Sequence, residues 1–494
     1  MKSTTQMHST GPVGLAELER RLAEDLHWLD LPAKPWVLPS AVEGEALLDV
    51  AIIGGGMAGL AAATALTHLG VAARIYDQAP QGMEGPWATI ARMETLRSPK
   101  QLTGPALGLP SLTFQAWFLA QFGAADWDVL DKIPRLQWMD YLRWYRKVMH
   151  LDVCNEHRVE RIVPHADHVE LSLRSPAGPL TVRARHVVLA TGRAGLGGPS
   201  VPAFVQHLDR RLWAHSSDVM DYGALRGLRV GVVGAGASAM DSAATALEHG
   251  AKRVDLFIRR NVIPRVNKGK GAGSAGFTLG YKDLPDDWKW RIRHYINEQQ
   301  VPPPHASVLR VSRHDNAFFR VGTPVLGVTQ HGDTLHLQTP EGVSEVDFLV
   351  AATGFKVDWS VRPEFNVIAP HVRLWGDRYT PAAGQEDPEL AGAPDLGPGF
   401  EFQPKAGHLL PGLSRIHCLC YPATLSHGTV SGDIPAVSEG AQRVAHALVS
   451  RLFSEQIDRH YDAIRAYAEP ELLGDEWTPA PRGASHRSTQ ENDA

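Results

Sequence analysis

The sequence predicts an α/β protein in which a strand, a glycine-rich turn and a helix occur together twice. The first copy is "VAIIGGGMAGLAAA" (residues 50–63) and the second is "VGVVGAGASAMDSA" (residues 230–243). Two further apolar runs, "RHVVLATGR" (185–193) and "VDFLVAATGFKVD" (346–358), each close on Ala-Thr-Gly. A chain of 494 residues is long enough for two or more domains.

Composition limits the kind of protein and its partners. Hydrophobic residues make up 44% and charged residues 21%, which is typical of a soluble globular chain. The net charge of −5 gives no broad basic surface, so we expect neither a nucleic acid nor a membrane partner. The three cysteines are too few for a disulfide framework, and we expect a cytoplasmic protein without a signal peptide. No metal-binding motif such as H-E-x-x-H occurs, so no metal is expected.

The first glycine turn has every part of a dinucleotide-binding unit. Gly54, Gly56 and Gly59 form G-x-G-x-x-G between a short apolar strand and a helix. These glycines allow a tight turn, a close approach to a pyrophosphate and close packing of helix on strand. Asp77 ends the next strand, where a carboxylate would bind a ribose hydroxyl.

The second turn differs at two places. Gly234 and Gly236 are kept, but Ser238 and Ala239 follow where the third glycine would fall, and alanine is tolerated there. The acid at the end of the following strand is replaced by Arg259 and Arg260. Guanidinium groups pair with a 2′-phosphate, which predicts NADPH rather than NADH. The alternative is that the two arginines form a solvated surface pair.

These units predict two Rossmann-like dinucleotide-binding domains, the first discontinuous and the second inserted into it. An acid after the first turn and arginines after the second favour two different dinucleotides, FAD and NADPH. The expected boundaries are an N-terminal extension (1–44), the FAD domain in two parts (45–225 and 346–475), the NADPH domain (226–345) and a flexible tail (476–494). A helix is expected over 15–29, and ordered proline-rich and glycine-rich loops over 360–413.

The order of these motifs resembles the single-component, class B-like flavoprotein monooxygenases. This group includes the flavin-containing monooxygenases, the Baeyer-Villiger monooxygenases and the ornithine or lysine N-hydroxylases. The resemblance extends over about residues 46 to 450. It rests on the two glycine turns, on Gly85-Pro86-Trp87 and on Ala352-Thr353-Gly354-Phe355.

The resemblance also implies roles for individual residues. It places Trp87 beside the flavin and makes Thr353 and Gly354 part of the cofactor site. Asp433 begins a helix whose N-terminus would face the flavin pyrimidine, or it merely caps that helix. Arg97 and Lys100, in "TLRSPKQLTG", would hold a cofactor phosphate or an acidic substrate, or are solvated loop charges.

Two histidines are the remaining candidates. His427 would face the flavin or is a packed loop histidine. His215 matches the histidine of the family's linker signature, but Asp209 and Arg211 replace its aromatic and glycine positions. This departure weakens the Baeyer-Villiger assignment in particular.

The implied reaction is insertion of one oxygen atom from O2 into a small organic substrate through a flavin C4a-(hydro)peroxide. N- or S-oxygenation best fits the loop that contains Arg97 and Lys100 and the incomplete linker signature at His215. Baeyer-Villiger oxygenation of a ketone is the alternative. From other classes, an NADPH-dependent flavin oxidase or reductase and a flavoprotein without turnover remain open. The sequence names neither the substrate nor the oligomeric state, and a homo-oligomer is one open alternative.

Overall fold

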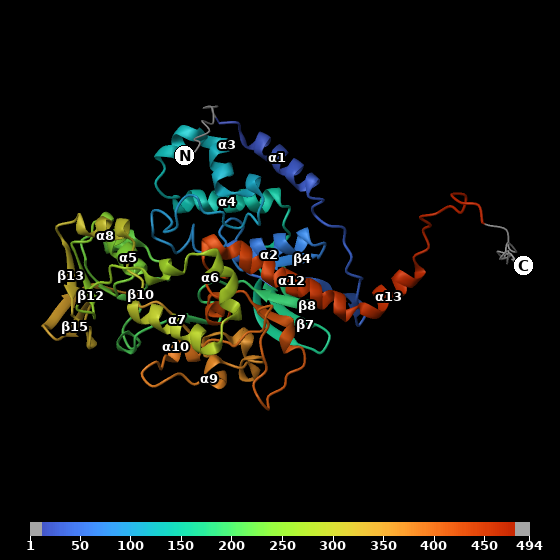
Figure 1. Cartoon of the computed structure of the whole chain (residues 1–494). Coiled ribbons are helices and arrows are strands. Elements are labelled where there is room, and N and C mark those ends of the chain that lie inside the picture. Colours follow the sequence, from blue (N-terminus) through green and yellow to red (C-terminus); the bar gives the residue numbers. More distant parts are fainter. Residues whose placement is uncertain (1–11, 480–494) are drawn as a thin grey trace, which may run out of the picture. The chain divides into compact units, whose positions relative to one another are not determined.

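A computed structural model of the chain describes residues 12–479 (Figure 1). These residues form two compact units, one up to Ser450 and one from Arg451. Both glycine turns and the sheets that carry them belong to the first unit. No helix among the described residues is long and apolar enough to cross a membrane.

The first sheet carries the first glycine turn. In the described part of the chain it has seven strands, in the order β5-β4-β3-β8-β7-β6 with β19 also paired to β8. The strands β5, β4, β3, β8 and β19 run parallel, and β6, β7 and β8 form an antiparallel meander. The bounds are β3 (Leu48–Ile53), β4 (Ala73–Tyr76), β5 (Val153–Cys154), β6 (Arg158–Pro164), β7 (Val169–Ser175), β8 (Gly178–Leu189) and β19 (Ile416–Cys418).

The second sheet carries the second glycine turn and is wholly parallel. Its five strands lie between residues 213 and 351 in the order β10-β17-β11-β12-β13. Parallel strands need helical crossovers, and α5 (Ala237–Glu248) and α8 (His305–Ser312) lie beside β12 and β13 in Figure 1. The bounds are β10 (Trp213–His215), β11 (Arg229–Val233), β12 (Arg253–Ile258), β13 (Ala317–Val321) and β17 (Phe348–Ala351).

Strand pairing corrects the expected boundary between the two nucleotide domains. The run 346–358 was expected to return to the first sheet, but β17 pairs with β11 in the second. β10 also joins the second sheet, although it precedes residue 226. The sequence does not separate the two cases, because β8 and β17 both run into Ala-Thr-Gly. Of the two, only β8 lies in the first sheet.

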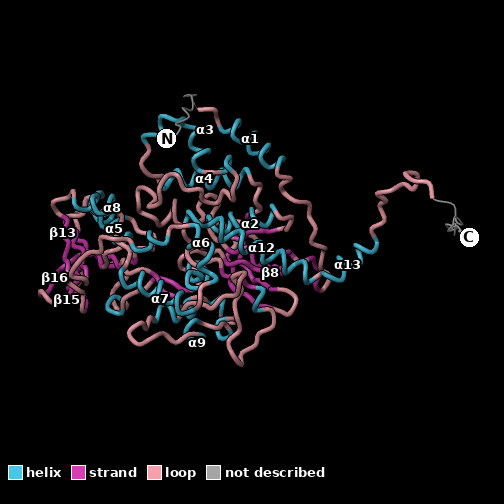
Figure 2. Tube along the Cα trace, viewed as in Figure 1, coloured by secondary structure: helices cyan, strands magenta, loops and turns pink. Residues whose placement is uncertain are grey.

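The chain crosses between the two sheets twice, and the crossings are joined. β9 (Gly197–Pro199) follows the first Ala-Thr-Gly and β18 (Phe355–Val357) follows the second, and they pair antiparallel. A three-stranded antiparallel sheet lies within residues 327–346, drawn in magenta in Figure 2. The remaining strands are β1 (Ala41–Val42), β2 (Glu45–Ala46), β14 (Gly327–His331), β15 (Thr334–Thr339) and β16 (Gly342–Val346).

Helices cover these sheets and fill the long connections. α2 and α5 begin directly after the glycine turns, and the helix expected over 15–29 is α1. The bounds in the first unit are α1 (Leu15–Trp28), α2 (Met57–His68), α3 (Phe114–Val129), α4 (Arg135–Val148), α5 (Ala237–Glu248), α6 (Ala275–Gly280), α7 (Asp286–Gln299), α8 (His305–Ser312), α9 (Trp375–Arg378), α10 (Pro388–Ala391) and α11 (Thr424–His427). α12 (Val437–Glu455) runs into the second unit, which contains α13 (Ile457–Ala466).

The structure describes the loops predicted over residues 360–413, but only the first part of the predicted tail. Residues 360–413 contain only short helical turns, α9 and α10 among them, between long ordered loops, as their proline and glycine content predicts. The expected tail begins at residue 476, and its residues from 480 lie outside the described part of the chain, as do residues 1–11.

Candidate cofactor and substrate site

The first glycine turn has the geometry that a bound pyrophosphate requires. Gly54 has φ of +107°, and a Cβ atom there would lie 2.5 Å from the carbonyl oxygen of Ala190. A Cβ atom at Gly59 would lie 1.9 Å from the carbonyl oxygen of Gly54. Gly56 is the N-cap residue of α2, so the free N–H groups of the first helical turn follow it. The turn is therefore a backbone cradle for phosphate, although contact with a cofactor stays a prediction.

Asp77 is held at the edge of this turn. Its Oδ2 accepts a hydrogen bond from the Gly55 amide at 2.6 Å, and its Oδ1 accepts one from the Ala79 amide at 2.7 Å. Burial raises the pKa of Asp77, and these two amides act in the opposite direction. Each carboxylate oxygen has a further lone pair, so the side chain can still accept a ribose hydroxyl.

Glu84 is a second carboxylate at this turn, and the sequence reading missed it. Its side chain is buried, and Oε1 accepts hydrogen bonds from Arg146 at 2.8 Å and from Asn155 at 2.6 Å. Glu84 lines a cavity of about 890 Å³, part of it open solvent, together with Gly55 and Gly56. The signal in the sequence is the position of this acid directly before Gly85-Pro86-Trp87.

Trp87 lies in a loop that α4 fixes. The edge of its ring faces Trp138, with the ring centroids 6.5 Å apart, and its carbonyl oxygen accepts a hydrogen bond from Arg135. Burial lowers the pKa of Arg135, and the neighbouring cations Arg92 and Arg310 lower it further. Trp87 therefore stands beside a cationic group that the sequence did not reveal, since its members are far apart along the chain.

Arg97 and Lys100 have different surroundings. Arg97 is half-buried, and its Nη2 donates to the carbonyl oxygen of Pro302 at 2.6 Å. Burial lowers the pKa of Arg97. Lys100 donates to the carbonyl oxygen of Trp127 and lies 4.9 Å from that ring. Because this carbonyl belongs to the last turn of α3, Lys100 acts as a cation at a helix C-terminus, and these contacts give no support to a catalytic role.

We expect Lys100→Met to lower stability and to leave catalysis unchanged. The variant loses one hydrogen bond and the interaction with the α3 dipole, which together contribute about 1 kcal/mol to the free energy of unfolding. Chemical denaturation measures this loss, and steady-state NADPH oxidation checks activity. Lys132→Met, at a partly exposed lysine outside this contact, is the matched control. A tenfold fall in kcat with unchanged stability would contradict the structural role.

Thr353 and Gly354 tie the two crossings together. The Thr353 hydroxyl donates to the carbonyl oxygen of Ser200 at 2.5 Å, and the Ser200 amide donates to the carbonyl oxygen of Gly354 at 2.8 Å. His215, at the end of β10, is buried, and its ring edge faces Phe355 at 5.8 Å. Burial lowers the pKa of His215. All three residues therefore stabilise the linker, and a direct cofactor contact remains a prediction for Thr353 and Gly354.

The second turn repeats the first, with Ala239 in place of the third glycine. Gly234 has φ of +135°, and Gly236 is the N-cap residue of α5. Ser238 is exposed in the first turn of α5, where a phosphate would be reached. Ala239 is fully buried, and its Cβ lies in van der Waals range of a Cβ built at Gly234. The methyl group thus fills space between helix and turn, as its position predicts.

The two arginines after β12 are not equivalent. Arg259 is exposed, and within the described chain its side chain has no hydrogen bond or ion pair. The Nη2 of Arg260 donates to the carbonyl oxygen of Glu298 at 3.0 Å. Arg259 is therefore free to bind a phosphate, whereas Arg260 already has a protein partner.

Asp433 stands at the start of the C-terminal helical segment. It is exposed and precedes the turn Ile434–Ala436, which leads into α12. Its side chain makes no capping hydrogen bond, so the capping alternative does not apply in this structure. A place beside the flavin pyrimidine stays a prediction.

His427 is a packed loop histidine. Its ring is buried and stacks on Phe400 with the centroids 3.8 Å apart. Its Nε2 lies 2.9 Å from the carbonyl oxygen of Gly397, to which it donates, and Nδ1 accepts from Arg443 at 3.3 Å. Burial, followed by the charge of Arg443, lowers the pKa of His427 to about 3. A neutral ring with both nitrogens engaged gives a flavin-facing role no support.

The lowered pKa of His427 predicts a pH dependence of stability. Between the ordinary pKa of about 6.5 and the folded value of about 3, the unfolded chain binds the additional proton. Stability therefore falls as pH falls through this range, by up to about 1.4 kcal/mol per pH unit from this group. In denaturant titrations between pH 6.5 and 4, His427→Gln should show a shallower slope than the wild-type protein. His207→Gln, at an exposed histidine, should not; equal slopes for all three proteins would refute the assignment.

Comparison with known proteins decides the family. The chain is 39% identical over 478 residues to the FAD-dependent urate hydroxylase of Xanthomonas campestris, and the match covers 96% of this chain and the whole of the relative. The chain belongs to the class B flavoprotein monooxygenases. The predicted FAD and NADPH cofactors and the oxidoreductase class are those of this family.

Other comparisons agree with the fold of this monooxygenase. The family model for pyridine nucleotide-disulphide oxidoreductases matches residues 51–270. An ornithine N-hydroxylase of Kutzneria sp. 744 superposes with a TM-score of 0.64 at 18% identity, over 82% of this chain and 99% of that one. The ornithine hydroxylase of Pseudomonas aeruginosa gives 0.65 at 17%, over 82% and 100%. The predicted α/β fold with two nucleotide-binding sheets is thus confirmed.

Proposed function

We propose that this monooxygenase hydroxylates urate or a closely related oxidised purine. The observation that carries the proposal is the 39% identity to the urate hydroxylase, which extends over the full length of that enzyme. The reaction would convert substrate, O2, NADPH and a proton into hydroxylated substrate, NADP⁺ and water. One oxygen atom of O2 enters the substrate and the other leaves in water.

The residues of the chain would bind and orient the reactants. Bound FAD supplies hydride acceptance from NADPH and the activation of O2. Gly54 and Gly59 shape the cradle for its pyrophosphate, and Asp77 offers an acceptor to its ribose. Arg259 would hold the 2′-phosphate of NADPH. The observation that supports this division is the free guanidinium of Arg259 beside a glycine turn, whereas the first turn has carboxylates.

A nitrogen or sulfur as the oxygenated atom remains a second candidate. The resemblance of the loop around Lys100 to that of the N-hydroxylases favours this candidate. The ammonium group of Lys100, however, donates to a carbonyl oxygen at the end of α3. The ornithine hydroxylases, at 17 and 18% identity, share the fold and do not determine the reacting atom. Full-length similarity to a urate hydroxylase therefore favours oxygenation of a purine ring. Oxygenation of a ketone has no further support in the structure.

The test is turnover of urate by the purified FAD-bound protein. With NADPH and O2, we expect urate-dependent NADPH oxidation, loss of urate absorbance and one ¹⁸O atom in the product from ¹⁸O2. NADPH oxidation that is independent of urate and yields stoichiometric hydrogen peroxide would overturn the proposal in favour of an oxidase. Incorporation into an amine or thioether, but not into urate, would favour the second candidate.

A further inference from the structure

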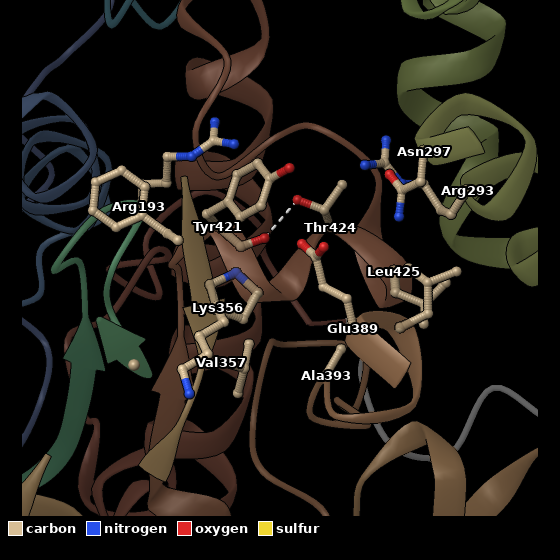
Figure 3. A pocket seen from close by; sticks show the side chains of 14 residues that line it. Arg193, Arg293, Asn297, Lys356, Val357, Glu389, Ala393, Tyr421, Thr424 and Leu425 are labelled. Carbon is tan, nitrogen blue, oxygen red and sulfur yellow. Dashed lines mark hydrogen bonds between the residues drawn. The ribbon is translucent and has the colours of Figure 1, made fainter. Parts of the chain in front are cut away.

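A hollow lined by three helices and by both linker crossings lies near the segments that are expected to bind the flavin. It encloses about 550 Å³, part of it open solvent. In Figure 3 the side chains of Arg293 and Asn297 enter from α7, Glu389 from α10, and Arg193 and Tyr421 from the opposite wall. None of these five residues was singled out from the sequence.

The hollow has an excess of positive charge. Neither Arg193 nor Arg293 has a hydrogen bond or ion pair within the described residues, and the Nε atom of Arg293 is buried without a partner. Arg378, the last residue of α9, does have ion-pair partners. It pairs with Asp286 at 2.7 Å and with Asp395 at 2.8 Å. Arg293 is half-buried and Arg193 is exposed, and the charges of both act on the carboxylate of Glu389. Two guanidinium groups therefore face one carboxylate, and this excess of positive charge indicates an anionic ligand.

Flat aromatic surfaces accompany these charges. The guanidinium of Arg193 lies 4.5 Å from the ring centroid of Tyr421 and 5.9 Å from that of Phe355. The Tyr421 carbonyl accepts a hydrogen bond from Thr424 at 2.6 Å, which fixes this wall. Planar guanidinium and aromatic groups favour stacking on a planar ligand.

Two lining residues of the hollow belong to segments that lead to the expected flavin site. The Tyr421 ring is the nearest group to a Cβ built at Gly432, at 3.7 Å, and Asp433 follows that glycine. On the other side, Arg193 is three residues after Ala190, whose carbonyl oxygen contacts the first glycine turn at Gly54. The hollow is therefore lined by residues that lie close in sequence or in space to both segments that are expected to bind FAD.

We propose that this hollow binds the substrate as a planar oxyanion, with Arg293 and Arg193 as its anion-binding groups and Tyr421 as a stacking surface. The assignment rests on the proposed function, since urate is a planar monoanion at neutral pH. A guanidinium fork matches the adjacent oxygen and nitrogen atoms of such a ring. Glu389, on the facing wall, accepts a hydrogen bond from a ring N–H.

The experiment separates binding from turnover. Urate is titrated by calorimetry into the oxidised, FAD-bound protein without NADPH, and KM values for urate and NADPH are measured separately. Arg293→Ala removes a charge-assisted hydrogen bond to the ligand, so it should weaken urate binding at least about tenfold. The KM for NADPH and the FAD content should not change. Arg293→Lys should retain part of the affinity.

The matched control is Arg291→Ala on the same helix. Arg291 is exposed and lies over Trp288, so its loss should leave urate binding unchanged. If the wild-type protein oxidises urate and Arg293→Ala binds it normally, the site is wrong and the proposed function stands. If the wild-type protein binds urate without oxidising it, the function fails and the variants still decide the site. If the wild-type protein does not bind urate, both fail.

Discussion

Gly59→Ala should yield a protein that has lost nearly all of its FAD. The added Cβ would lie 1.9 Å from the carbonyl oxygen of Gly54, so α2 must move away from β3. Overpacking of this kind costs about 3 kcal/mol, which corresponds to about 100-fold in affinity if it falls on the cofactor. The ratio of flavin absorbance to protein after gel filtration measures the loss, and denaturant titration measures any fall in stability.

Gly236→Ala is the matched control at the second turn. Nothing lies within 4 Å of a Cβ built there, and the backbone φ of −83° suits alanine. This variant should keep its FAD and its stability, while the KM for NADPH rises because the methyl group meets the approaching pyrophosphate. Full FAD content in Gly59→Ala, or equal loss of FAD in both variants, would show that the first turn does not hold the flavin cofactor.

The fold could be predicted from the sequence because its determinants are local. A strand, a glycine turn and a helix specify each other over about 30 residues, and both copies were found in this way. The boundary between the domains could not, because β17 is assigned to a sheet by its partner β11, more than 100 residues away. Its Ala-Thr-Gly ending is the same as that of β8 and contains no information about the partner.

The candidate site was predictable only where backbone geometry is required. Gly54 and Gly59 occupy positions that a side chain would block, and such a requirement is visible in the sequence. Lys100 and His427 were chosen by residue type, and the structure gives each a packing role through a distant partner, Trp127 or Phe400. Glu84 and Arg293 were missed for the same reason, since their surroundings come from segments far apart in the chain.

Arg259→Ala should convert the preference for NADPH that we expect into near indifference between NADPH and NADH. Arg259 follows β12 at the edge where the second turn lies, and its guanidinium has no partner within the described residues. Losing a charge-assisted pair with a 2′-phosphate costs about 1.5 to 3 kcal/mol, which is a rise of about 10- to 100-fold in the KM for NADPH. The KM for NADH should change little, because NADH has no phosphate there.

Two further variants test whether the effect depends on the position of the positive charge at Arg259. Lys252→Ala removes one exposed cation just before β12, at the opposite end of the same strand, and should leave both KM values unchanged. Arg260→Ala should have a smaller effect than Arg259→Ala, because Arg260 donates to the carbonyl oxygen of Glu298. Equal changes for NADPH and NADH in Arg259→Ala would mean that the arginine acts on the whole cofactor or on folding. In that case the second turn would lose its assignment as an NADPH-selective site, while its role in binding a dinucleotide would stand.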